Sequence, residues 1–166
     1  MSTIECYHPK EDMMSRKDWD SIRRNLSRAV KENGDWVLEI GAYMGETTAF
    51  MAGLLQGYET QGHRVISVDP FSIHYKEPFN LVGNKQEYQN KLIERKVFYM
   101  VDCLSCTSEE ATKYLGEGFA FLLIDGSHTY ENVKLDILNY TPRLKRGGIV
   151  WFHDYSHTSV YGVKQA

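Results

Sequence analysis

Five short apolar segments, separated by stretches of helical periodicity, constrain the fold of this chain most. They cover residues 36–41, 64–71, 97–103, 119–125 and 149–154. Each is an almost unbroken apolar run, which is typical of parallel strands buried on both faces of a sheet. The stretches between them, such as residues 46–58 and 85–96, provide the helical crossovers that parallel strands require. The sequence therefore predicts an α/β fold with a mostly parallel sheet of about five strands.

Local signals predict several element boundaries. Ser15 with Asp18, and Thr107 with Glu110, have the spacing of capping boxes at helix starts. The pair Gly147–Gly148 is interpreted as a tight turn before the last strand. A further helix is predicted from an apolar stripe at helical spacing, formed by Val133, Ile137, Tyr140 and Leu144.

Length and composition favour a single water-soluble domain over residues 1–166, including an N-terminal segment and helix over residues 1–33. The net charge of −3 gives no basic surface of the kind that nucleic acids or anionic membranes attract, so neither partner is expected. No apolar run approaches the roughly 20 residues of a membrane span. The first 18 residues lack the order of a secretory signal, which makes a cytoplasmic protein the expectation.

Three cysteines leave two interpretations open. Cys103 and Cys106 have the C-x-x-C spacing of half a zinc site or of a redox pair, but no second pair accompanies them. Free, reduced thiols are the favoured interpretation for these two residues and for Cys6, and a metal or redox role is the alternative.

Acidic residues end every predicted strand. Because parallel strands connected by right-handed crossovers place their carboxyl ends at one edge, these groups are expected to meet there, where such sheets bind ligands. Any one acid could simply cap the next helix. Together they would repel one another unless a cationic ligand, a metal or several hydrogen-bond donors compensated. The set comprises Glu39, Asp69, Asp102, Asp125 with His128, and His153 with Asp154.

The segment after the first predicted strand is rich in glycine but departs from the dinucleotide pattern G-x-G-x-x-G. Gly41 allows a sharp turn and Gly45 allows close helix packing, while Ala42 and Tyr43 fill the middle of the motif. Glu39 adds a carboxylate that is unfavourable beside a pyrophosphate, which prefers bare helix N–H groups. The pattern therefore argues against a dinucleotide.

A ligand that carries both an ammonium and a carboxylate suits this segment better. Glu39 would attract the ammonium, and Thr47 or Thr48 at the helix start would donate to the carboxylate. S-adenosylmethionine has both groups together with a sulfonium cation. Asp69 would accept hydrogen bonds from ribose hydroxyls, and Asp102 would accept from an adenine amine.

The motifs resemble those of class I S-adenosylmethionine-dependent methyltransferases. The segments "LEIGAYMGETT", "VISVDPF", "VDC" and "LLIDGSHTYENVKLDILNYTPRLKRGGIVWFHDY" occur in that family's order. The last is similar to the subgroup of macrolide-sugar O-methyltransferases and cephalosporin-hydroxylase-like proteins. The resemblance implies a Rossmann-like, doubly wound sheet of order 3-2-1-4-5. The family's usual C-terminal antiparallel hairpin is not found, so the sequence is either a fragment or a minimal version of the fold. Without the hairpin, the edge of the fifth strand would be unpaired. A second copy of the chain is therefore expected to cover that edge, giving a homo-oligomer.

The resemblance also implies site residues. Asp125, His153 and Asp154 occupy the positions at which metal-dependent relatives bind a divalent cation. Two carboxylates suit Mg²⁺, whereas His153 replaces an acid and leaves room for a softer ion or for none. Asp125 would bind either the metal or the amino group of the cofactor. The implied cofactor-binding residues are Glu39, Gly41, Ala42, Tyr43, Gly45, Thr47, Asp69, Asp102, Cys103 and Asp125.

His128, with Asp125, is the candidate catalytic residue. We expect its imidazole to act as the general base that takes a proton from the acceptor hydroxyl, although a helix-capping or packing role is the simpler alternative. Tyr130, Tyr155 and His157 are lesser candidates for contact with the acceptor, and the aromatic residues of segment 71–79 are candidates for a lid.

Three functions follow from these observations. The leading one is methyl transfer from S-adenosylmethionine to a hydroxyl of a small molecule, with a possible divalent metal. A non-catalytic module that binds the same cofactor is the second. An NAD(P)-dependent oxidoreductase is the third, and the missing middle glycine and Glu39 argue against it.

Overall fold

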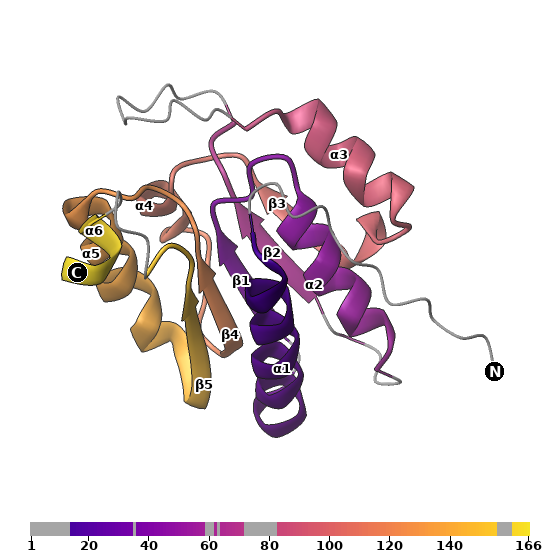
Figure 1. Cartoon of the computed structure of the whole chain (residues 1–166), viewed down its shortest axis with the longest axis horizontal. Coiled ribbons are helices and arrows are strands. Elements are labelled where there is room, and N and C mark those ends of the chain that lie inside the picture. The colour runs from indigo at the N-terminus through magenta and orange to yellow at the C-terminus, as the bar shows by residue number, and fades with distance from the viewer. Residues whose placement is uncertain (1–13, 35, 59–61, 63, 72–82, 156–160) are drawn as a thin grey trace.

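A parallel five-stranded sheet forms the centre of the molecule (Figure 1). The computed structural model describes residues 14–34, 36–58, 62, 64–71, 83–155 and 161–166. The strands are β1 (Trp36–Ile40), β2 (Arg64–Val68), β3 (Val101–Leu104), β4 (Phe119–Ile124) and β5 (Leu144–Phe152). Their order is β3-β2-β1-β4-β5, and every neighbouring pair is parallel. The predicted fold class and strand order are confirmed, and no antiparallel strand follows β5 among the described residues.

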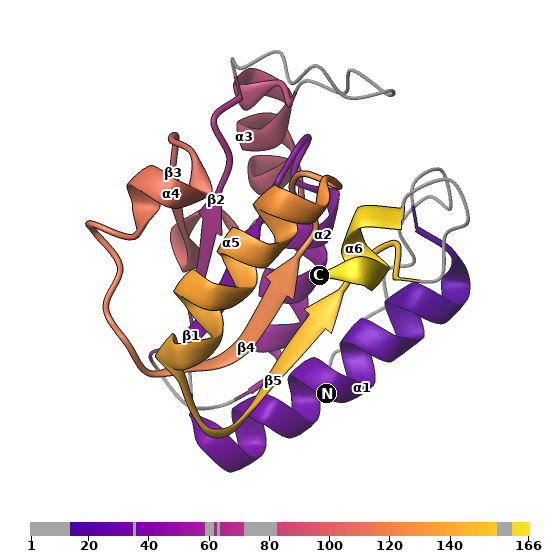
Figure 2. The ribbon, with the colours of Figure 1, turned by 90° about the vertical axis from the view of Figure 1, so that its left-hand side faces the viewer.

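Helices cover both faces of the sheet, as the views in Figures 1 and 2 show. One face carries α1 (Arg16–Asn33), α2 (Glu46–Gln56) and α3 (Lys85–Glu94), and the other carries α4 (Ser108–Ala111), α5 (Tyr130–Tyr140) and α6 (Tyr161–Gln165). The core accordingly has two large apolar clusters, one on each face. No helix in the described part of the chain is both long and apolar enough to cross a bilayer.

Both predicted capping boxes are present. The Ser15 and Thr107 hydroxyls each accept from the backbone N–H three residues later, and the acid at that position accepts in return from the backbone N–H of the capping residue. Each box satisfies two backbone donors that a helix start would otherwise leave unpaired.

The chain after α5 differs from the prediction. Leu144 does not extend the helical stripe, because a short 3₁₀ helix containing Pro142 (Thr141–Arg143) follows α5, and Leu144 begins β5. Gly147 and Gly148 lie inside β5 rather than in a turn before it. A register irregularity between the pairings of Phe119 and Phe121 accommodates them, since glycine is common where a strand bulges.

The third strand also begins later than predicted. Residues Phe98–Met100 form a 3₁₀ helix, so β3 covers only Val101–Leu104. Asp102 is therefore an early residue of the strand and not its end. It pairs in register with Ile66, and its carboxylate forms a two-pronged ion pair with Arg64, with both contacts at 2.6 Å. The predicted placement of Asp102 at the ligand-binding edge is wrong.

Candidate active site

The carboxyl edge of the sheet holds a buried acid, Glu39. Alternation along β1 points Val37 and Glu39 toward α2, while Leu38 and Ile40 point toward the opposite face. The Thr48 hydroxyl donates to Oε2 of Glu39 at 2.5 Å.

The environment of Glu39 suits a cationic ligand. Its side chain is fully buried, and Oε1 has no hydrogen-bond donor among the described residues. Burial raises the pKa of Glu39 to about 8, the negative charges of Asp125 and Asp69 add to that rise, and the hydrogen bond from Thr48 opposes it. A positive group placed next to Oε1 would relieve both the missing hydrogen bond and the repulsion.

Asp69 organises the glycine segment. Its carboxylate accepts hydrogen bonds from three backbone N–H groups, those of Ala42 at 2.9 Å, Tyr43 at 2.7 Å and Phe71 at 2.8 Å. The loops after β1 and β2 are thereby tied together. The prediction assigned Asp69 to the ribose and did not foresee this loop contact, which uses three of its roughly four acceptor positions.

Two glycines are required by close packing around this loop. Gly41 has φ 90°, and a Cβ there would lie 2.1 Å from the carbonyl oxygen of Asp125. Gly45 has φ 81°, and a Cβ there would lie 2.8 Å from the ring of Tyr88. Tyr88 is itself buried and shares a 2.5 Å hydrogen bond with the Ser67 hydroxyl. A larger residue at Gly41 would therefore displace backbone atoms, and one at Gly45 would displace the buried ring of Tyr88.

Tyr88 is a supporting residue that the sequence interpretation missed. The available signal was a single aromatic residue in segment 85–96, four residues before Leu92 and therefore on the same helical face. Cys103 lies close to Tyr88 and Ser67. Burial raises the pKa of its thiol, and hydrogen bonds with Tyr88, Ser105 and Ser67 oppose that rise. Cys103 and Cys106 are both free thiols, as favoured from the sequence.

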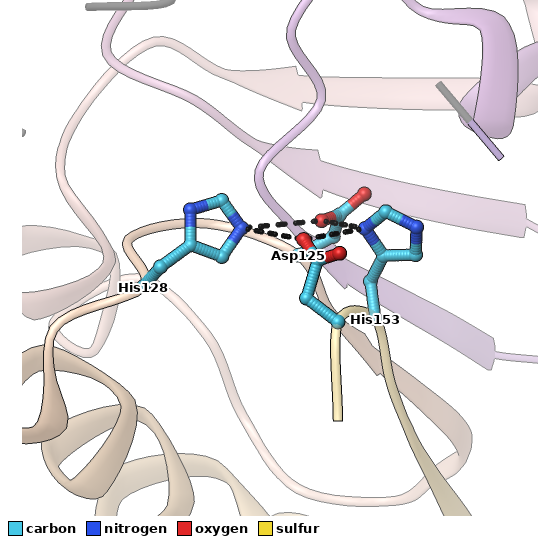
Figure 3. Close-up of side chains that lie close together, drawn as sticks. Asp125, His128 and His153 are labelled. Carbon is cyan, nitrogen blue, oxygen red and sulfur yellow. Dashed lines mark hydrogen bonds and ion pairs between the residues drawn. The ribbon is translucent and has the colours of Figure 1, made fainter. Parts of the chain in front are cut away.

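Four residues from two chain segments form a compact cluster, which we call the His–Asp tetrad: Asp125 and His128 after β4, and His153 and Asp154 after β5. One ligand atom from each lies within 4.8 Å of the others. Figure 3 shows the His128 and His153 rings on opposite sides of the carboxylate oxygens. Nδ1 of His153 is 2.9 Å from Oδ1 of Asp125 and 3.0 Å from Oδ2 of Asp154. Nε2 of His128 is 3.0 Å from Oδ2 of Asp154 and 3.9 Å from Oδ1 of Asp125.

Strand register explains why the tetrad forms. Ile124 pairs with Phe152, so the next residues, Asp125 and His153, leave the sheet side by side. Asp154 follows in a left-handed conformation, with φ 55°, and its carboxylate reaches both imidazoles. The sequence interpretation grouped Asp125, His153 and Asp154 as metal ligands, and it paired His128 with Asp125 as catalytic residues; the structure brings all four together.

The carboxylates favour protonation of both imidazoles. Hydrogen bonds to Asp125 and Asp154 raise the pKa of His128 to about 10, against the effect of burial. Burial lowers the pKa of His153, but the same two carboxylates outweigh it and raise the value to about 10. Burial raises the pKa of Asp154, and the two histidines reverse this and hold it well below its usual range. A protonated imidazole cannot accept a proton, and this argues against His128 as a general base. That role stays a prediction.

The remaining candidates are less well placed or lie outside the described residues. Tyr155 is exposed and Tyr130 is at the margin of exposure. Thr47 is half-buried, and its hydroxyl contacts the sulfur of Met14 at 4.0 Å. His157, Cys6 and most of segment 71–79 lie outside the described residues.

Comparisons with known proteins agree with this fold. A family model described as a methyltransferase domain matches residues 38–155. An uncharacterized protein of Acanthamoeba polyphaga mimivirus is 26% identical over 143 residues, which cover 81% of this chain and 58% of that protein. The chain therefore spans little more than half the length of this relative.

Solved structures share the fold at low sequence identity. The TDP-rhamnose 3′-O-methyltransferase CalS11, from calicheamicin biosynthesis, is 21% identical, with a TM-score of 0.69 over 89% of this chain and 67% of that one. The O-methyltransferase NovP is 19% identical, with a TM-score of 0.75 over 92% of this chain and 70% of that one. An O-methyltransferase of Bacillus cereus in complex with SAH is 14% identical, with a TM-score of 0.62 over 92% and 67%.

Proposed function

This chain belongs to the class I S-adenosylmethionine-dependent methyltransferases, and we propose that it methylates a hydroxyl oxygen of a small molecule. The observation that carries the cofactor side of the proposal is Glu39, a buried carboxylate with an oxygen that lacks a donor, beside the start of α2. An ammonium of the cofactor would pair with Glu39, while backbone N–H groups at the helix start would receive its carboxylate.

The glycine segment would hold the methionine part of the cofactor. Its conformation is fixed by Asp69 and by the close approach of Gly41 to the Asp125 backbone, so the site is formed before the ligand arrives. Preorganisation of this kind lowers the ordering cost of binding. Asp69 has acceptor capacity left for a ribose hydroxyl. The ion pair with Arg64 removes Asp102 from the proposed contacts, and Cys103 stays a predicted neighbour of the adenine.

The His–Asp tetrad would lie on the acceptor side of the site. Asp125 links the two sides, because its backbone packs against Gly41 and its carboxylate belongs to the tetrad. The residues fit a divalent cation, which would supply charge stabilisation for an acceptor oxygen. The protein's own part is to align the acceptor oxygen with the sulfonium methyl group and to exclude water.

The acceptor class rests on the structural neighbours. CalS11 is a sugar O-methyltransferase by name, and NovP is an O-methyltransferase. A hydroxyl of a sugar or another small molecule is the acceptor that we propose by analogy of fold. A second candidate is a non-catalytic module that binds the same cofactor.

Calorimetry and methyl transfer test this proposal in two steps. S-adenosylhomocysteine is expected to bind and NAD is not, and Glu39→Gln is expected to weaken the binding because it removes the negative charge opposite the ammonium. Asp102→Asn is the matched control, since this half-exposed acid pairs with Arg64 away from the edge. Transfer of labelled methyl to any of a panel of sugar nucleotides and phenols would show catalysis. NAD binding without S-adenosylhomocysteine binding would refute the proposal, and cofactor binding without transfer to any acceptor would favour the module.

A further inference from the structure

The donor atoms of the His–Asp tetrad already have the spacing of ligands around one small cation. Ligands bound at 2.1 Å lie about 3.0 Å apart when adjacent in an octahedron and about 4.2 Å apart when opposite. Three contacts in the tetrad measure 2.9, 3.0 and 3.0 Å, and the fourth measures 3.9 Å. A cation could therefore replace the hydrogen bonds with small movements of the side chains.

The backbone around the tetrad is packed tightly enough to hold this arrangement. Asp125 leaves β4 against Gly41, whose absent side chain makes room for the Asp125 carbonyl oxygen. On the other side, a Cβ on Gly162 of α6 would lie 2.0 Å from the carbonyl oxygen of His128 and 2.6 Å from the backbone nitrogen of Tyr130. Helix α6 thus packs directly against the backbone of the segment that carries His128, and this packing helps to position the imidazole.

The donor set decides which cation fits. Mg²⁺ takes oxygen ligands and keeps much of its water, whereas imidazole nitrogen suits Zn²⁺, Co²⁺, Fe²⁺ and similar ions. Half of the donors here are imidazole nitrogens, Nε2 of His128 and Nδ1 of His153. We propose that the tetrad is a two-histidine, two-carboxylate site for a divalent transition metal, with His128 as a direct ligand.

This inference deepens the proposed function by naming the cation class of that same site and reassigning His128. A ligand that donates through Nε2 cannot use the same atom as a general base. His128 is then a binding residue, and its loss is expected to lower metal affinity before it affects any other property. This distinguishes the inference from the sequence-based expectation.

Metal titrations of the full chain, made metal-free with a chelator and without cofactor or acceptor, test the inference. We expect Zn²⁺ and Co²⁺ to bind at least about tenfold more tightly than Mg²⁺ in calorimetry. Bound Co²⁺ is expected to give visible absorption altered by nitrogen ligation. His128→Ala and His128→Gln are each expected to weaken Co²⁺ binding at least about tenfold and to change that absorption. Asp102→Asn is expected to leave both unchanged.

Three outcomes would overturn the inference. Mg²⁺ binding as tightly as Co²⁺ would reject the cation class. Co²⁺ affinity and absorption unchanged in both His128 variants, with their folding verified by circular dichroism, would reject His128 as a ligand. Absence of binding by any of the three metals at millimolar concentration would show that the tetrad is a hydrogen-bonded cluster alone. Because S-adenosylhomocysteine affinity is measured separately on the metal-free chain, failure of the proposed function is distinguished from failure of the metal assignment.

Discussion

Asp136 lies on the buried side of α5, between Val133 and Tyr140 along the same helix face. Its side chain is only 2% exposed, and Oδ1 has no hydrogen-bond donor among the described residues. Burial raises the pKa of Asp136 to about 6, and a hydrogen bond from Ser108 offsets part of that rise. An ionised carboxylate in this position is therefore a cost to the folded state, and we expect Asp136→Asn to remove it.

The magnitude follows from the size of the pKa change. An aspartate in an unfolded chain titrates near pH 3.9, and each unit of difference is worth about 1.4 kcal/mol. A folded pKa of about 6 thus corresponds to roughly 3 kcal/mol between the protonated and ionised forms. The folded protein holds the proton while the unfolded chain releases it. This contribution to stability is therefore full below about pH 4, and it is lost as the pH rises to 6.

Urea denaturation followed by tryptophan fluorescence at several pH values between 4 and 8 measures the effect. The difference in unfolding free energy between Asp136→Asn and wild type is expected to move in favour of the variant by roughly 2 kcal/mol between pH 4 and 7. Asp136→Leu controls for hydrogen bonding, because its side chain is neutral and branched at Cγ like that of aspartate but cannot form a hydrogen bond. It is expected to show the same pH-dependent difference with a different constant offset. A difference that does not vary with pH in either variant would refute the reasoning.

Three further predictions concern the sheet edge and the glycine loop. The pKa of Glu39 is raised to about 8, so at lower pH Glu39 must release a proton before it can pair with an ammonium. S-adenosylhomocysteine affinity is therefore expected to rise from pH 6 to 8, and the buffer takes up the released proton. Calorimetry in buffers of different ionisation enthalpy checks this, and Glu39→Gln should abolish the proton release; a pH-independent wild-type affinity would contradict it. Gly53→Ala should stabilise α2 by up to about 1 kcal/mol, because a Cβ there meets nothing within 4 Å. Gly41→Ala should instead destabilise the fold and weaken S-adenosylhomocysteine binding. Urea denaturation measures both, and an equal decrease in unfolding free energy in the two variants would reject the packing argument. Since β5 forms one edge of the sheet, pairing of that edge with a second copy is expected to give a dimer in sedimentation, and a monomer at all concentrations would contradict it.

The sheet could be predicted because its signals are local. Each strand is an apolar run that ends near an acid or a glycine, and parallel order then places the ends at one edge. Glu39 and Asp125 were predicted to meet there, and in the structure the negative charge of Asp125 adds to the rise that burial causes in the pKa of Glu39. The prediction failed where a boundary was uncertain by a few residues. The late start of β3 moved Asp102 away from the edge and into an ion pair with Arg64.

The tetrad could be predicted only in part, because it depends on register between strands. Sequence spacing places His128 three residues after Asp125, but it does not say that Phe152 pairs with Ile124. That pairing brings His153 beside Asp125, and a shift of one residue would have turned its side chain to the other face. Asp136 was missed for a different reason. It occupies the buried helical face with Val133 and Tyr140, and because acids are seldom buried, helical spacing alone does not predict its burial.

Backbone hydrogen bonds join the cofactor side and the tetrad into one rigid unit. Beyond the strand ends, the N–H of Gly41 donates to Val68 at 2.9 Å, that of Asp125 donates to Ile40 at 2.8 Å and that of His153 donates to Ile124 at 3.1 Å. The sheet pairing thus continues for one residue past three strands, and among the described residues this pairing connects the glycine loop to the tetrad. Because this backbone is shared, a change at Gly41 that displaces Asp125 should reduce both S-adenosylhomocysteine and Co²⁺ affinity. A change at His128 should reduce only Co²⁺ affinity. This asymmetry between the two titrations follows from covalent and hydrogen-bonded connectivity alone, and it does not depend on the identity of an acceptor.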